Sequence, residues 1–156
     1  LRYDVLGSTN TNDGDATATT ATNPVANTLM AALPSDLRAV MQPMTIYTDN
    51  TGGGSDNASY VTKTTDYLPL LAEYEIFGTR TYANSAEKNY QAQYAYYSAG
   101  NSKVKYRHSA TGSTAWWWER SPNYTNSITF CFVYTNGTAN YNLARNSIGV
   151  APAFRV

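Results

Sequence analysis

The chain has 156 residues, which is enough for one domain with a hydrophobic core of its own. Its 11 basic and 11 acidic residues cancel, and charged residues make up only 14% of the chain. We therefore expect no nucleic-acid partner, because nucleic acid attracts a basic surface, and no membrane insertion, because no apolar run reaches the roughly 20 residues required. Since the chain opens on Leu1, we expect it to be the C-terminal part of a longer protein.

The first third of the sequence predicts a loop followed by two short helices. Residues 7–23 are small and polar and have no aliphatic anchor, which is typical of a flexible loop or insertion. Apolar residues then recur at helical spacing between Leu29 and Met41. Because proline cannot donate a hydrogen bond inside a helix, two helices that meet near Pro34 fit this pattern better than one.

The middle of the chain predicts a strand, a loop and a core segment. Residues 45–48 have strand composition, and residues 49–57 are rich in Gly, Asn and Asp, as turns are. The compact apolar run at residues 66–78 should lie in the core and end at Gly78. Within this run Glu73 and Glu75 alternate with Tyr74 and Ile76, and this pattern indicates a structural role for the two acids and not a catalytic pair.

A third helix is expected at residues 84–100. Asn84 or Ser85 can cap its first turn, and Gly100 is placed to end it. Helical spacing puts three tyrosines on one face: Tyr90, Tyr94 and Tyr97.

Short strands dominate from Val104 onward, in the runs 114–122, 127–134, 138–142 and 150–156. Helices first and strands second favour the α+β class with an antiparallel sheet. Consecutive tryptophans at 116–118 must point to alternate faces of a strand, so at least one belongs to the core.

Catalytic and metal-binding motifs have little support in this sequence. His108 is the only histidine and has no nucleophile signature beside it, which indicates a surface loop residue. Cys131 lies between two phenylalanines, where an inert buried thiol is expected. One histidine and one cysteine also exclude a conventional zinc site. We therefore expect no catalytic residue, no metal and no cofactor.

The most unusual composition lies in residues 123–148. Fifteen of these 26 residues are Asn, Tyr, Thr or Ser, and Arg145 alone carries a charge. Disorder does not fit, because Phe130, Phe132 and Val133 form an apolar run. The composition instead indicates a packed β-region with an adaptable polar surface.

Several motifs taken together resemble a bacterial and phage domain family with a C-type-lectin-like fold. They are Trp-Trp-x-Arg-Ser-Pro within 116–122, Phe-Cys-x-Val at 130–133, Gly137, and Gly-Val-x-Pro-x-Phe at 149–154. With the upstream segments, the resemblance covers about residues 25–156. It implies an α+β fold in which two or three short helices pack on a small twisted antiparallel sheet with long loops.

The resemblance further implies a single domain over residues 1–156, in which 116–156 carries a displayed surface. Some members of this family are variable proteins of diversity-generating retroelements, whose reverse transcriptase randomises adenines in a C-terminal coding segment. Antibody loops favour the same residue types, because Tyr supplies rigid contact area and Asn and Ser supply adaptable hydrogen bonds.

Matching to the family pattern divides the positions into scaffold and display. The scaffold positions are Trp117, Trp118, Arg120, Pro122, Ser127, Phe130, Cys131, Val133, Gly137, Ala139, Tyr141, Ala144, Gly149, Pro152 and Phe154. The displayed, ligand-binding positions are Tyr124, Asn126, Ile128, Phe132, Tyr134, Asn136, Asn140, Asn142, Arg145 and Ile148.

Two expectations conflict in the strand at residues 127–134. Simple alternation puts four residues on one face and buries that face, namely Ile128, Phe130, Phe132 and Tyr134. The resemblance instead buries Cys131 and Val133 and exposes Phe132 and Tyr134. We adopt the second arrangement, because exposed aromatic side chains suit a binding surface. Phe130 then needs a bulge or local twist to reach the core.

The resemblance implies a receptor-binding domain without enzymatic activity, such as a target-recognition module of a phage tail or a bacterial surface adhesin. The expected partner is a protein or another cell-surface receptor, and a homotrimer or other homo-oligomer would supply avidity. The calcium- and sugar-binding motifs of animal C-type lectins are absent. Two alternatives stay open: an undiversified structural or cell-surface module, and a relative of formylglycine-generating enzymes.

Overall fold

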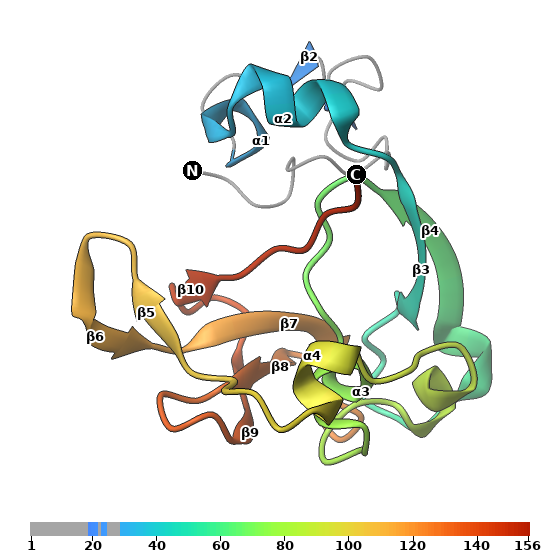
Figure 1. Ribbon diagram of the computed structural model, residues 1–156. Helices are drawn as coiled ribbons and strands as arrows, with labels where there is room; N and C mark the ends of the chain where they lie inside the picture. The colour runs from blue at the N-terminus through green and yellow to red at the C-terminus, as the bar shows by residue number, and fades with distance from the viewer. Residues whose placement is uncertain (1–18, 22, 25–28) are drawn as a thin grey trace. The chain divides into compact units, whose positions relative to one another are not determined.

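The computed structural model describes residues 19–21, 23–24 and 29–156 (Figure 1). It has the α+β composition that the sequence predicts, with short helices and small sheets. Most of the loop expected at 7–23 lies outside the described residues.

Contacts between residues divide the chain into two compact units, which are taken here one at a time. The expectation of a single domain stays a prediction. The first unit comprises residues 1–46, 63–69 and 152–156, and the second comprises 47–62 and 70–151.

The first unit contains the two predicted helices. Helix α1 covers Leu29–Ala32 and α2 covers Ser35–Val40, and the extended backbone of Pro34 separates them. Two short strands, β1 (Thr19–Thr20) and β2 (Asn23–Pro24), pair antiparallel before them.

Apolar side chains at helical spacing form the core of this unit. Met30, Met41 and Leu68 are buried there together with Ala21. The end of the chain joins this unit through backbone hydrogen bonds, including one of 2.8 Å from the Gln42 N–H to the Arg155 carbonyl.

Strands β3 (Met44–Asp49) and β4 (Val61–Asp66) form a two-stranded sheet, and β3 contains the predicted strand. A loop and the short 3₁₀-helix η2 (Ala58–Tyr60) connect these two strands. The division between the units falls inside both strands.

The second unit is built on a four-stranded sheet in the order β10-β7-β8-β9. Its strands are β7 (Trp117–Pro122), β8 (Thr129–Val133), β9 (Ala139–Leu143) and β10 (Gly149–Val150). Strands β7, β8 and β9 pair antiparallel, as predicted, whereas β10 pairs parallel to β7. The strand expected at 150–156 is wrong beyond Val150, because the backbone after it forms isolated bridges only.

Two short helices pack on the inner face of this sheet (Figure 1). Helix α3 (Glu73–Phe77) ends at Gly78, whose φ of 70° gives the left-handed cap. Ile76 from α3 and Tyr97 from α4 (Ala95–Ser98) form a core with Trp117 and Val133.

The long helix predicted at residues 84–100 is wrong. The segment forms the 3₁₀-helix η3 (Ser85–Asn89), an irregular stretch and then α4. Hydrogen bonds to α3 replace the regular helical hydrogen bonds, since the Tyr94 N–H donates to the Glu75 carbonyl at 2.9 Å. Two terminal predictions are confirmed, because the Asn84 side chain caps η3 and Gly100 follows α4 with a φ of 82°.

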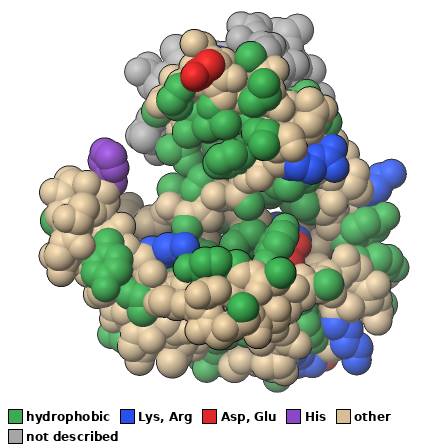
Figure 2. Space-filling view, viewed as in Figure 1, with side chains coloured by type: hydrophobic (Ala, Val, Ile, Leu, Met, Phe, Trp, Pro, Cys, Tyr) green, Lys and Arg blue, Asp and Glu red, His purple; other side chains and the backbone are tan. Residues whose placement is uncertain are grey.

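The remaining strands form a separate hairpin. Strand β5 (Lys105–Arg107) pairs antiparallel with β6 (Ala110–Ala115), with an irregular register after Tyr106. Exposed His108 lies in the turn, as predicted, and is the purple side chain in Figure 2.

Candidate ligand-binding surface

The strand register defines which side chains share the outer face of the second unit's sheet. Trp118 pairs with Phe132, which pairs with Asn140 on the next strand, and Phe130 pairs with Asn142. Cross-strand partners point to the same side of a sheet. These residues therefore form one continuous face of aromatic and asparagine side chains.

The opposite face is closed by the core. Trp117 and Val133 are cross-strand partners and are 1% and 0% exposed. The Trp117 Nε1–H donates to the Lys103 carbonyl oxygen at 3.0 Å, so the buried indole is also paired. Burial of Trp117, Cys131 and Val133 agrees with the sequence prediction.

Phe132 is a correction to the predicted display set, because only 2% of this residue is exposed. It points away from the core but is covered by other rings, with centroid distances of 5.4 Å to Trp116 and 6.1 Å to Trp118. Simple alternation is also wrong for this strand, since Ile128 is 60% exposed. Strand β8 is buried on both faces near its C-terminal end, which neither expectation anticipated.

Phe130 is a second correction. The expected bulge exists, because β7 advances from Trp118 to Pro122 while β8 moves only from Phe132 to Phe130. Phe130 nevertheless stays half-buried on the outer face and belongs to neither core cluster.

The other nine predicted positions reach the surface to different extents. Four are exposed, namely Asn126, Ile128, Asn136 and Arg145, and five are half-buried, namely Tyr124, Tyr134, Asn140, Asn142 and Ile148.

The fold brings several of these positions together. Tyr134 lies beside Phe132 on the outer face, with ring centroids 6.2 Å apart. Ile128 lies next to the turn that carries Arg145, because the Ala144 N–H donates to the Ile128 carbonyl at 3.1 Å.

Two predicted positions lie apart from this group. The Tyr124 ring packs under the Arg80 guanidinium, 3.8 Å from its central carbon. Ile148 lines a groove of about 700 Å³ beside the β5–β6 hairpin.

The asparagines of the surface have a common hydrogen-bond pattern. The side-chain oxygen of each accepts from a nearby backbone N–H, for example from Ile128 to Asn126 at 3.0 Å. Their side-chain amide nitrogens have no hydrogen-bond partner among the described residues. The oxygens of Asn126 and Asn136 thus stabilise turns, whereas those of Asn140 and Asn142 accept from the next residue of β9. The amide nitrogens remain available as donors. The group comprises Asn126, Asn136, Asn140 and Asn142.

A buried polar network holds the sheet in place. Arg120 forms a bidentate ion pair with Glu75, with both N–O distances at 2.6 Å. The Glu73 carboxylate accepts backbone N–H groups from residues 81–83. These contacts give Glu73 and Glu75 the structural role that the sequence predicts.

Burial also changes ionisation in this network. It raises the pKa of the Glu87 carboxyl, although hydrogen bonds from the Asp49 N–H and the Ser121 hydroxyl and the charge of Arg120 oppose that shift. Burial likewise raises the pKa of the Tyr97 hydroxyl.

The sequence prediction missed the contribution of Trp116 to the outer face and the groove beside the hairpin. Trp116 is half-buried and stacks on Phe132, yet its position was given no binding role. The groove is lined by Lys105, Arg107 and His108 together with Trp116. The signal for it was the basic run at residues 103–108, which overall neutrality concealed.

The second unit is thus an α+β module with a closed inner face and an outer face of aromatic and asparagine side chains. A family model described as "Domain of unknown function (DUF6273)" matches residues 22–156, and the chain belongs to that family. Searches of curated proteins and of solved structures gave no significant match. Among the described residues, no helix combines the length and apolarity that crossing a bilayer requires.

Proposed function

We propose that this chain is a receptor-binding domain with a C-type-lectin-like fold whose surface at residues 124–148 is diversified by a retroelement. The setting is a phage tail or bacterial surface adhesin, and the partner is a protein or another cell-surface receptor. The domain recognises this partner and catalyses no reaction.

One observation carries the proposal: the core closes the inner face of the sheet, and most of the positions assigned to display lie outside that core. Trp117, Cys131 and Val133 are buried, while four of the ten positions assigned to display are exposed and five are half-buried. Substitutions on such a surface change recognition at little cost to the core. Arg145 is the one charged residue in the segment 123–148, so few ions would lose solvation in a complex.

The buried Phe132 restricts the proposal. The Phe132 ring contacts three other aromatic rings, so this position tolerates apolar replacements best. Diversification there would select among aromatic and aliphatic side chains. We therefore assign Phe132 to the support of the surface and Tyr134 to its contact layer.

The coding sequence provides the direct test. We expect a near-copy of the segment for residues 124–148 close to the gene, with differences confined to adenine positions of the copy. The segment for residues 61–98 serves as the control and should have no such copy. Absence of a copy, or differences spread over all four bases, would refute diversification.

An undiversified structural module is the second candidate, and the asparagine oxygens favour it because they stabilise turns. A display library separates the two. Randomising Tyr134, Asn140 and Asn142 should yield folded, protease-resistant binders to a purified bacterial surface protein, whereas the structural module should lose its fold. A library at Tyr90 and Tyr96, which are exposed and lie outside the assigned positions, controls for non-specific selection.

A further inference from the structure

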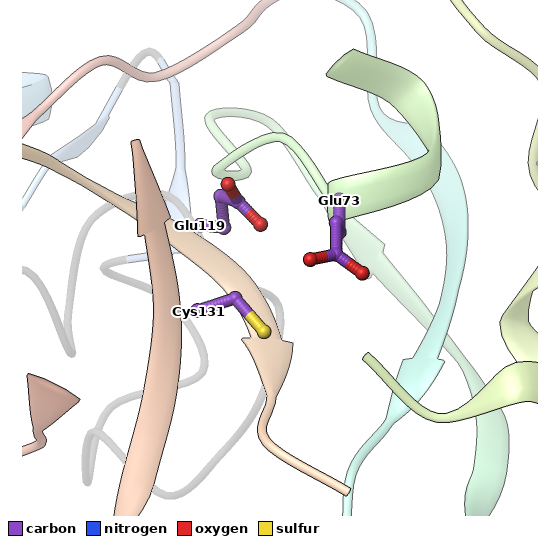
Figure 3. Close-up of side chains that lie close together, drawn as sticks. All are labelled: Glu73, Glu119 and Cys131. Atoms are coloured by element: carbon purple, nitrogen blue, oxygen red, sulfur yellow. The ribbon is translucent and has the colours of Figure 1, made fainter. Parts of the chain in front are cut away.

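A cluster of three buried ligand-type side chains lies beneath the sheet surface. Glu73 comes from α3, Glu119 from β7 and Cys131 from β8 (Figure 3). Their carboxylate oxygens and sulfur lie within 4.8 Å of one another, and no residue of the three is more than 1% exposed.

Glu119 has no partner in the described part of the chain. Both of its carboxylate oxygens are buried without a hydrogen bond, although its side chain is directed toward Glu73 and Cys131 (Figure 3). Nearly all buried polar groups in proteins are paired, so an orphaned carboxylate needs a partner that the chain does not supply.

The surrounding charges sharpen this need. Glu73 and Glu87 are buried acids near Glu119. Arg120 is the nearby cation, but its guanidinium is committed to Glu75, Thr48 and a backbone carbonyl. This interior therefore carries more negative than positive groups.

We propose that Glu73, Glu119 and Cys131 bind a divalent transition-metal ion of the zinc class. Carboxylate oxygen and cysteine sulfur are both zinc ligands, and the sulfur disfavours calcium and magnesium. The site is independent of the proposed recognition function and extends beyond it, because it would tie α3 to β7 and β8.

The structure already supplies outer contacts for such a site. The backbone N–H groups of residues 81–83 donate to the Glu73 carboxylate at 2.8–3.0 Å and orient it, as outer contacts orient metal ligands. The Cys131 S–H donates to the Pro122 carbonyl oxygen at 3.8 Å, and this contact orients the sulfur. Zinc binds cysteine as the thiolate, so metal binding would release the proton of the Cys131 thiol.

The sequence did not predict this site, because one histidine and one cysteine form no conventional zinc motif and the two carboxylate ligands are not marked by any local spacing. Glu73 and Glu119 lie far apart in the chain and are brought together by the packing of α3 on the sheet.

The test uses the full 156-residue chain, produced with zinc and purified without chelator. We expect stoichiometric zinc by elemental mass spectrometry and a lower thermal unfolding midpoint after chelation, restored by added zinc. Refolding with cobalt(II) should give the charge-transfer absorption of a sulfur–cobalt bond.

Variants separate metal binding from simple protonation. Glu119→Gln and Cys131→Ser should each lose the metal and unfold at lower temperature than wild type. Glu87→Gln is the matched control, since it changes a buried acid outside the cluster and should retain the metal.

The opposite result would assign Glu119 a proton instead of a metal ion. Wild-type protein without bound zinc and without the cobalt–sulfur absorption would overturn the site even if a variant failed to fold. A Glu119→Gln variant as stable as wild type, or more stable, would do the same, because glutamine resembles the protonated acid.

Discussion

Arg120 joins three separate segments of the second unit to strand β7. Its guanidinium donates to the Thr48 hydroxyl at 2.6 Å, to the Leu70 carbonyl at 2.8 Å and to both oxygens of Glu75. Only a planar guanidinium has enough fixed donors for all of these contacts, so lysine is not an equivalent replacement.

We expect Arg120→Ala to lower the free energy of unfolding by about 3–5 kcal/mol, because it leaves the buried Glu75 carboxylate unpaired. Arg80→Ala is the control, since the Arg80–Asp56 pair is 25% and 35% exposed and such pairs contribute about 0–1 kcal/mol. Denaturant unfolding measures both variants. Equal losses would show that burial of the Arg120 pair is unimportant.

Glu87 predicts a dependence of stability on pH. Since burial raises its pKa above the usual 4.5, the folded chain binds this proton more tightly than the unfolded chain. Its contribution to stability is complete below about pH 4.5 and is lost as pH rises through the folded-state pKa. Glu87→Gln cannot lose that proton, so its stability relative to wild type should increase between pH 4.5 and 8. A constant difference in urea unfolding across this range would contradict the assignment.

At the scale of the element, the polar loops depend on close backbone approaches. Gly54 has a φ of +66°, and a Cβ there would lie 2.7 Å from the Ser127 backbone nitrogen. This glycine therefore lets the loop at 49–57 lie against the turn that carries Asn126 and Ile128.

We expect Gly54→Ala to destabilise the chain more than Gly100→Ala. Both glycines have positive φ, for which alanine costs about 1–2 kcal/mol, but Gly100 has open space around it. The clash at Gly54 should add about 1–3 kcal/mol and shift the turn. Thermal unfolding and amide chemical shifts of residues 126–128 check this, and similar effects at both sites would contradict it.

At the scale of the whole molecule, the proposed surface is small. Nine displayed positions fall below the roughly 20–30 residues per side of a standard interface. Balanced charge also gives the chain little long-range attraction for a partner. Useful binding would then depend on several copies acting together.

We predict that fusing the chain to a trimeric coiled coil raises its apparent affinity for an immobilised target by about 10²–10⁴-fold. The target is the bacterial surface protein used to select the display library, and surface plasmon resonance at high and low target density is the measurement. A Tyr134→Ala trimer should lose binding, while Tyr90→Ala, which removes the stacking contact with Tyr47, should not. Equal monomer and trimer affinities at high density would contradict the need for avidity.

The sequence alone determined the features that depend on local chemistry. Proline between two apolar helical runs predicted the break at Pro34, and alternation in 116–118 predicted a buried tryptophan. Asn84 and Gly100 marked the ends of their segment, because capping needs only neighbouring backbone groups. The α+β class followed from the order of these elements.

Only the tertiary structure decided how distant segments share the interior. The helix predicted from the spacing at 84–100 was prevented by hydrogen bonds to α3. Phe132 was buried by Trp118 on the adjacent strand β7 and by Trp116, which immediately precedes that strand. Glu73 and Glu119 became neighbours in the same way. Periodicity reports which side of an element a residue occupies, whereas burial depends on what packs against that side, and those partners lie far away in the sequence.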